Sequence, residues 1–176
     1  MSRPNFYARQ QRQRLMTSCE PVVDTITTAI RGAAKLTKPE VAFMMGPLRA
    51  AHKALREGVA TDLEWCHLAH AMNVAMAIER RGVVRGIKDH IHSAEVALAA
   101  IQDRASATGT WKPTALHWYE LDDIASAVDL HEFQLSQLSR SEFNAAVIHA
   151  TNEVRSTGGR VVRVDWAGRF TGRKAA

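Results

Sequence analysis

The sequence predicts an all-α protein, a helical bundle of five or six helices with a basic tail at each end. Apolar residues recur every three or four positions through most of the chain, as one face of an α-helix requires. Three segments carry a hydroxyl residue followed three positions later by glutamate, the capping box that starts a helix. The apolar residues, 46% of the chain, are mainly aliphatic, and this composition favours helix over sheet.

The first two helices are expected over 21–36 and from the capping box of Thr37 and Glu40 onward. In such a box the hydroxyl and the carboxylate satisfy free amides of the first helical turn. Pro47, which follows a glycine, is expected to bend or break the second helix, because proline has no amide hydrogen to donate. A short helix over 48–57 would then continue the apolar stripe.

The strongest helix is expected over 62–80, after a second capping box formed by Thr61 and Glu64. Its apolar stripe includes Cys66, which we interpret as core filling. Two closely spaced glycines after this helix predict a turn. Another helix is expected beyond the turn, to about residue 107.

The last two helices are expected over 114–138 and from a third capping box, formed by Ser139 and Glu142, to a pair of glycines. The valine-rich residues 160–166 would form a short β-strand, but one strand needs a partner. A homodimer that pairs this strand is one arrangement. A tail that becomes ordered on binding is the other.

The chain divides into a flexible basic arm over 1–16, one helical domain over 17–157 and a basic tail over 158–176. Its net charge of +5 is unevenly distributed. Residues 1–14 carry a net charge of +4 and residues 155–176 a net charge of +5, whereas the segment between them has a net charge of −4. Basic ends of this kind often contact phosphate backbones or acidic protein surfaces, although they also serve only to keep a protein dissolved.

The candidate binding residues are the basic side chains of the two ends and two tryptophans beside the connector that precedes residue 118. Tryptophan is a common anchor at protein interfaces. The alternative for both tryptophans is that they close one end of the helical core. The complete set is Arg3, Arg9, Arg12, Arg14, Arg160, Arg163, Arg169, Arg173, Lys174, Trp111 and Trp118.

A metal site is the one catalytic constellation that the sequence suggests. Two carboxylate–histidine pairs at i, i+3 on successive helices resemble the ligands of di-iron four-helix bundles. The residues concerned are Glu64, His67, Asp89, His92, Glu120 and Glu132. The two pairs would differ in level by roughly 12 Å, too far for a shared site. Since the chain also has no nucleophile elbow and no glycine-rich phosphate loop, we predict no enzyme activity, no cofactor and no metal.

The location is expected to be the cytoplasm. The two cysteines, Cys19 and Cys66, are far apart and in no metal or redox spacing, as suits a reducing compartment. No apolar run approaches the ~18 residues of a membrane span, and the basic N-terminus has no apolar signal-peptide region. We therefore expect neither secretion nor a membrane partner.

Several segments resemble one group of proteins. Residues 109–116, 119–121, 128–131 and 134–139 are similar to small uncharacterised helical proteins of proteobacterial phages, prophages and mobile elements. The arginine-rich N-terminal arm fits the same group. The resemblance implies no reaction, only a setting in the cytoplasm of a bacterial host.

The function predicted from these features is that of a non-enzymatic binding protein. It would regulate or inhibit a host protein or nucleoprotein complex, for example a defence complex, as anti-CRISPR proteins do. One alternative is direct DNA or RNA binding through the basic tails, with a helix-turn-helix variant formed by 48–57 and its residues Arg49, Lys53 and Arg56. A metal-binding helical-bundle enzyme is the other alternative.

Overall fold

The computed structural model describes residues 25–107, 109, 111–112 and 115–157. This part of the chain is all-α and contains no strand, so the predicted helical bundle is confirmed. Residues 25–33 are helical, and five complete helices follow them. They are α2 (Lys38–Arg56), α3 (Asp62–Arg81), α4 (Lys88–Ser106), α5 (Trp118–Gln137) and α6 (Arg140–Ser156).

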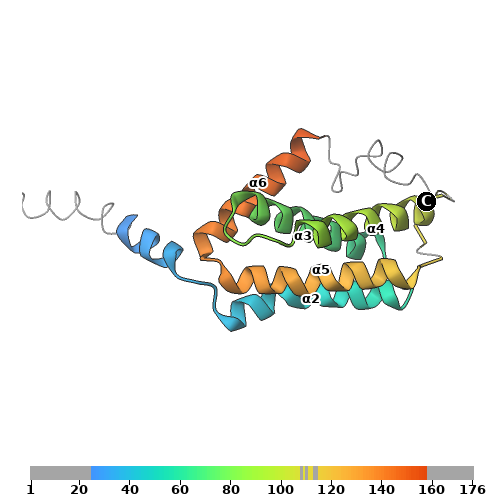
Figure 1. Cartoon of the computed structure of the whole chain (residues 1–176), viewed down its shortest axis with the longest axis horizontal. Helices are drawn as coiled ribbons and strands as arrows, with labels where there is room; N and C mark the ends of the chain where they lie inside the picture. The colour runs from blue at the N-terminus through green and yellow to red at the C-terminus, as the bar shows by residue number, and fades with distance from the viewer. Residues whose placement is uncertain (1–24, 108, 110, 113–114, 158–176) are drawn as a thin grey trace, which may run out of the picture.

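Helix α3 is the centre of the bundle, because it packs against α2, α4, α5 and α6. Helices α2 and α5 run side by side, and α6 begins beside the end of α5 and packs across α3 (Figure 1). Five consecutive residues of α3, Val74 to Ile78, are buried. A helix that is buried on every side needs apolar residues all round, and this half of α3 provides them.

The three predicted capping boxes are all present, at Thr37 with Glu40, Thr61 with Glu64 and Ser139 with Glu142. In each, the backbone N–H of the first residue donates to the glutamate carboxylate at 2.8 Å. A fourth box, which the sequence pattern did not predict, joins His117 to Glu120 at the start of α5. It was missed because histidine takes the place of the hydroxyl residue.

The expected break at Pro47 is wrong, because α2 continues through it as one helix. Pro47 lies on the exposed side of the helix, as does Phe43, whose carbonyl loses its amide partner. Water can bond to that carbonyl, while Met45 and Leu48 on the other side stay buried and hold the helix to the core. Residues 48–57 therefore form no separate recognition helix.

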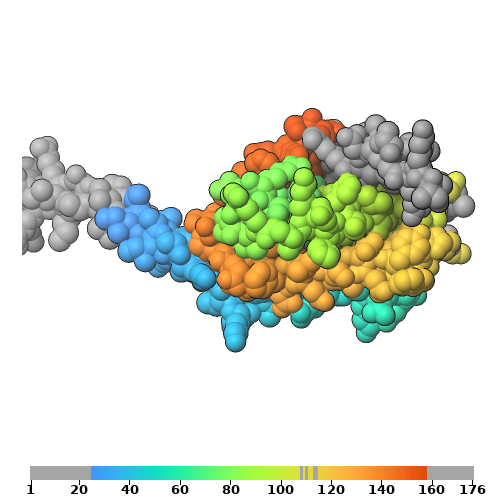
Figure 2. All heavy atoms as spheres, viewed as in Figure 1, coloured from blue at the N-terminus to red at the C-terminus, as the bar shows by residue number. Residues whose placement is uncertain are grey.

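The helical segment over 25–33 projects from the bundle (Figure 1; Figure 2). Its apolar residues Ile26 and Ile30 are exposed. The chain returns to the body at Leu36, whose N–H donates to the Leu138 carbonyl at 2.9 Å. This contact fixes the start of α2 against the turn between α5 and α6.

Two predictions concern the ends of the chain. The basic arm over 1–16 and the tail over 158–176, with its expected strand, lie outside the described residues.

The interpretation of Cys66 as core filling is wrong, because its side chain is exposed. Among the described residues, no helix combines the length and the apolar character needed to cross a membrane.

Candidate functional site

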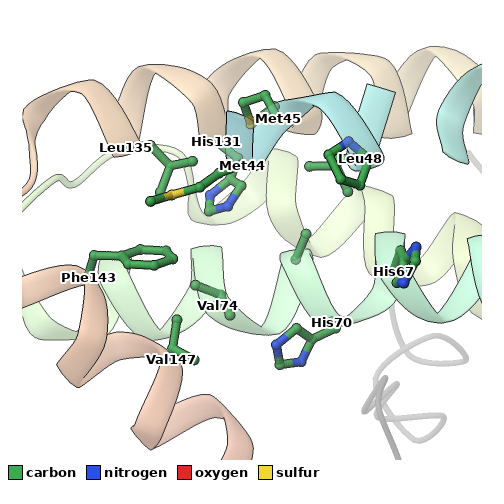
Figure 3. A pocket seen from close by; sticks show the side chains of 12 residues that line it. Met44, Met45, Leu48, His67, His70, Val74, His131, Leu135, Phe143 and Val147 are labelled. Atoms are coloured by element: carbon green, nitrogen blue, oxygen red, sulfur yellow. The ribbon is translucent and has the colours of Figure 1, made fainter. Parts of the chain in front are cut away.

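A cavity of about 330 Å³ lies between α2, α3, α5 and α6 (Figure 3). Nine of its twelve lining side chains are apolar, and the other three are His67, His70 and His131. We call it the His131 cavity. Its size falls within the range of pockets that hold small molecules or large side chains, roughly 300–1,000 Å³.

The His131 cavity is lined by fully buried side chains on one side and by partly buried side chains on the other. Met45 and Leu135 belong to the buried core and are almost fully enclosed. Met44, Phe143 and Val147 are only partly buried and pack against that core. Methionine adapts its shape easily and makes favourable contacts with aromatic rings, so this side can adjust to an inserted group.

His131 is the buried polar residue of the cavity, with only 4% of its surface exposed. Its Nδ1 lies 3.1 Å from the side-chain oxygen of Gln134. The amide nitrogen of Gln134 donates to the Ala75 carbonyl at 3.2 Å, which fixes the amide oxygen toward His131. Because that oxygen only accepts, Nδ1 must carry the proton.

The protonation state of His131 follows from its burial. Desolvation lowers the pKa of the imidazole, so the ring is neutral at pH 7. A neutral imidazole with its proton on Nδ1 has a lone pair on Nε2. The cavity is therefore lined by a hydrogen-bond acceptor whose tautomer is set by Gln134.

The Nε2 atom of His131 has no hydrogen-bond partner within the described part of the chain. There, the one fully enclosed side-chain nitrogen or oxygen without a partner is Nε of Arg104, so Nε2 of His131 borders open space. Figure 3 shows the His131 ring extending from α5 toward the space beside Val74 and Phe143. The fold leaves this acceptor available to an incoming group.

The other two histidines stand at the rim of the cavity, because both are exposed. Desolvation, and to a smaller extent the charge of His67, lower the pKa of His70. In the described ranges, no three histidine, cysteine, aspartate or glutamate side chains are grouped so that they could hold a metal ion. The three histidines are thus arranged around an apolar space and not around a common point.

The predicted binding residues separate into three groups. The nine basic residues of the two ends lie outside the described residues. Trp111 is half-buried, donates from its indole nitrogen to the Ala60 carbonyl at 2.9 Å, and packs on Trp65 with ring centres 6.0 Å apart. Trp118 is 75% exposed and meets Tyr119 edge to face. Trp111 closes the end of the core, and of the two tryptophans it is Trp118 that presents an exposed aromatic surface.

Three carboxylates of the suggested metal site have other partners. Glu64 belongs to a capping box, Glu120 pairs with Arg104, and Glu132 pairs with Arg49. The structure therefore uses these carboxylates within the bundle, and it does not bring the suggested ligands together.

A second buried ionisable group lies on α4. Desolvation raises the pKa of Glu95 to about 7, against the opposing attraction of Arg80. His92 stands 3.7 Å from its carboxylate. Glu95 lines neither the His131 cavity nor a smaller hollow of about 270 Å³ between α4 and α5. Glu95 is only 7% exposed, and its raised pKa bears on the stability of the fold.

Sequence reasoning missed the His131 cavity entirely. The available signal was a histidine and a glutamine at i, i+3 on the apolar face of the predicted helix over 114–138. Polar residues on a buried face need partners, so such a pair marks a built hydrogen-bond arrangement.

Comparisons with protein-family models, with curated proteins and with solved structures found no match to this chain. The resemblance to proteins of phages and mobile elements stays a prediction.

Proposed function

We propose that this protein is a non-enzymatic binding protein that holds a partner protein at the His131 cavity. The observation that carries the proposal is an apolar cavity of about 330 Å³ with one buried acceptor that the fold does not use. Apolar cavities with few, well-placed polar groups are the usual form of binding sites. A partner's side chain inserted there would be enclosed by four helices.

Binding fits the chemistry of the cavity better than catalysis does. A catalytic histidine works with a nucleophile or a positioned acid or base within hydrogen-bond reach. The described residues that line the cavity are apolar or histidine, without a carboxylate, hydroxyl or thiol. His131 is oriented by an amide, Gln134, which holds its tautomer but cannot take up a proton as a carboxylate does.

The biological setting is part of the same proposal. The resemblance of residues 109–116, 128–131 and 134–139 to proteins of phages and mobile elements supports action inside a bacterial host. In that setting, a helical protein that occupies a surface on a host complex would regulate or inhibit it. Defence complexes of the kind that anti-CRISPR proteins block are one such class of partner.

The proposal can be tested with a variant that fills the cavity. Val147→Trp adds bulk to the cavity wall, and Ile148→Trp adds the same bulk to the neighbouring side chain, which is 61% exposed. Each tagged variant and the wild type are used to capture host proteins, and purified candidates are then titrated by calorimetry. We expect a partner that binds the wild type and Ile148→Trp and loses at least tenfold in affinity for Val147→Trp.

Equal binding to all three proteins would contradict the proposal. Circular dichroism and thermal unfolding must first show that both tryptophan variants are folded. Since the two substitutions are adjacent and add the same side chain, a difference between them reports on the cavity and not on the added surface.

Direct DNA or RNA binding by the basic ends is a second candidate. The segregation of charge favours it, with net charges of +4 and +5 at the two ends. If phosphate contacts dominate, affinity for duplex DNA or single-stranded RNA should fall steeply between 50 and 200 mM salt. No binding at low salt would remove this candidate.

A further inference from the structure

We infer that the group the His131 cavity accepts is the indole of a tryptophan side chain. This inference rests on the proposed function and names the anchor residue of the partner. It is argued from the size of the cavity, from its polar content and from the character of its wall.

The size of the cavity suits a bicyclic aromatic group. An apolar cavity of about 150 Å³ is enough to bind benzene. The His131 cavity has about 330 Å³ and is partly open, so the larger indole can enter from the surface. Phe143 and Met44 supply an aromatic ring and a sulfur atom, both of which make favourable contacts with another ring.

The polar content selects among the aromatic side chains. Nε2 of His131 is an acceptor in a wall that is mainly apolar, with His67 and His70 at the rim, so a ligand that fills this space should bring a donor to it. Phenylalanine has no donor and would leave Nε2 unpaired. Tyrosine brings a donor together with an acceptor oxygen, for which the apolar side chains around His131 offer no donor; His67 and His70 point away from the His131 ring (Figure 3).

Tryptophan leaves nothing unpaired in this arrangement. Its indole carries one N–H and no acceptor, which complements one lone pair. Lysine and arginine also donate, but their charge would be placed against apolar side chains without a carboxylate to pair with it. The cavity therefore matches the one side chain that is large, aromatic and purely a donor.

The experiment uses the full-length protein and two soluble probes, N-acetyl-tryptophan amide and its 1-methylindole derivative. The methyl group removes the donor and keeps the ring. Binding is followed by NMR on protein labelled with nitrogen-15 at histidine, where the Nε2 signal of His131 reports the hydrogen bond. We expect the tryptophan probe to bind about tenfold more tightly and to be the only one that shifts this signal as a hydrogen bond does.

Each outcome separates this inference from the proposed function. Equal affinities for the two probes, or binding without a change at His131, would overturn the tryptophan assignment. Binding to Val147→Trp as strong as to Ile148→Trp would place the probe outside the cavity and overturn it too. If neither probe binds but Val147→Trp still loses the captured partner, the assignment falls and the proposed function stands.

Discussion

Two aromatic and polar regions of the bundle use their hydrogen-bonding groups differently. At the aromatic end, formed by Trp65 and Trp111, each indole N–H donates to a backbone carbonyl at 2.9 Å. Both rings therefore combine packing with a satisfied polar group. This region needs nothing from outside to be complete.

The His131 cavity is different. Nδ1 of the His131 ring is hydrogen-bonded to Gln134, but Nε2 has no hydrogen-bond partner among the described residues. Nε2 borders the open cavity and is not fully enclosed, whereas both indole nitrogens of the aromatic end are paired within the bundle. The aromatic end is therefore complete within the bundle, whereas the His131 cavity leaves one acceptor open to an added group.

The largest effect is expected at the aromatic end. Trp65 is 4% exposed, so Trp65→Ala should lower the free energy of unfolding by about 3–5 kcal/mol. The variant removes the contact with Trp111 and the indole hydrogen bond to the Leu98 carbonyl. Urea unfolding followed by circular dichroism measures the change. A loss below about 1 kcal/mol would mean that this end is not part of the core.

Glu95 is a third buried polar group, and its contribution to the stability of the fold should depend on pH. Its pKa of about 7 lies above the ordinary 4.5, so between these values the folded state holds a proton that the unfolded state has lost. Glu95 therefore contributes stability that is full below pH 4.5 and is lost as pH rises through 7.

We expect Glu95→Gln to become more stable relative to the wild type by up to about 3 kcal/mol between pH 4.5 and pH 8. Arg80, His92 and Glu153 surround the carboxylate, so both proteins are compared at one ionic strength. The matched control is Asp103→Asn, an exposed carboxylate on the same helix. Parallel stability profiles for the wild type and Glu95→Gln would refute the expected burial cost.

A smaller effect is expected from the side chain that orients His131. Gln134→Met keeps the volume but leaves Nδ1 of His131 without its acceptor and removes the additional hydrogen bond to the Ala75 carbonyl, so it should cost about 1–3 kcal/mol. Gln137→Met on the exposed side of the same helix is the control. Equal unfolding free energies for the two variants would show that the hydrogen bonds of Gln134 contribute nothing to the fold.

The smallest effect is expected at Trp118. Since this side chain is 75% exposed, Trp118→Ala should change the free energy of unfolding by less than about 0.5 kcal/mol. If the His131 cavity is the binding site, the same variant should also keep its affinity for the captured partner. A tenfold loss of that affinity would move the interface to the start of α5.

Much of the fold could be predicted from local sequence, because helices and their capping boxes depend on residues three or four positions apart. The errors came from three-dimensional context. Cys66 shares the apolar segment, but the buried stripe at the start of α3 runs through Trp65, Leu68 and Met72, which turns Cys66 outward. Pro47 looked like a helix breaker, and it is harmless because it lies on the exposed face of α2.

The candidate site could not be predicted in the same way. The His131 cavity is formed by the faces that four helices present to one another, and no short pattern specifies how those faces meet. Only the spacing of His131 and Gln134 was visible in the sequence. The Ala75 carbonyl, which orients the glutamine, comes from another helix and becomes apparent only in the folded chain.

The state of the His131 ring tests the central claim most directly. Nitrogen-15 NMR of the imidazole in the free protein at pH 7 distinguishes the two neutral tautomers from the charged ring. The hydrogen bonds of Gln134 predict a neutral ring with its proton on Nδ1 and an unprotonated Nε2. A proton on Nε2, in either the other tautomer or the imidazolium, would contradict the account, because the cavity would then offer a donor and not an acceptor.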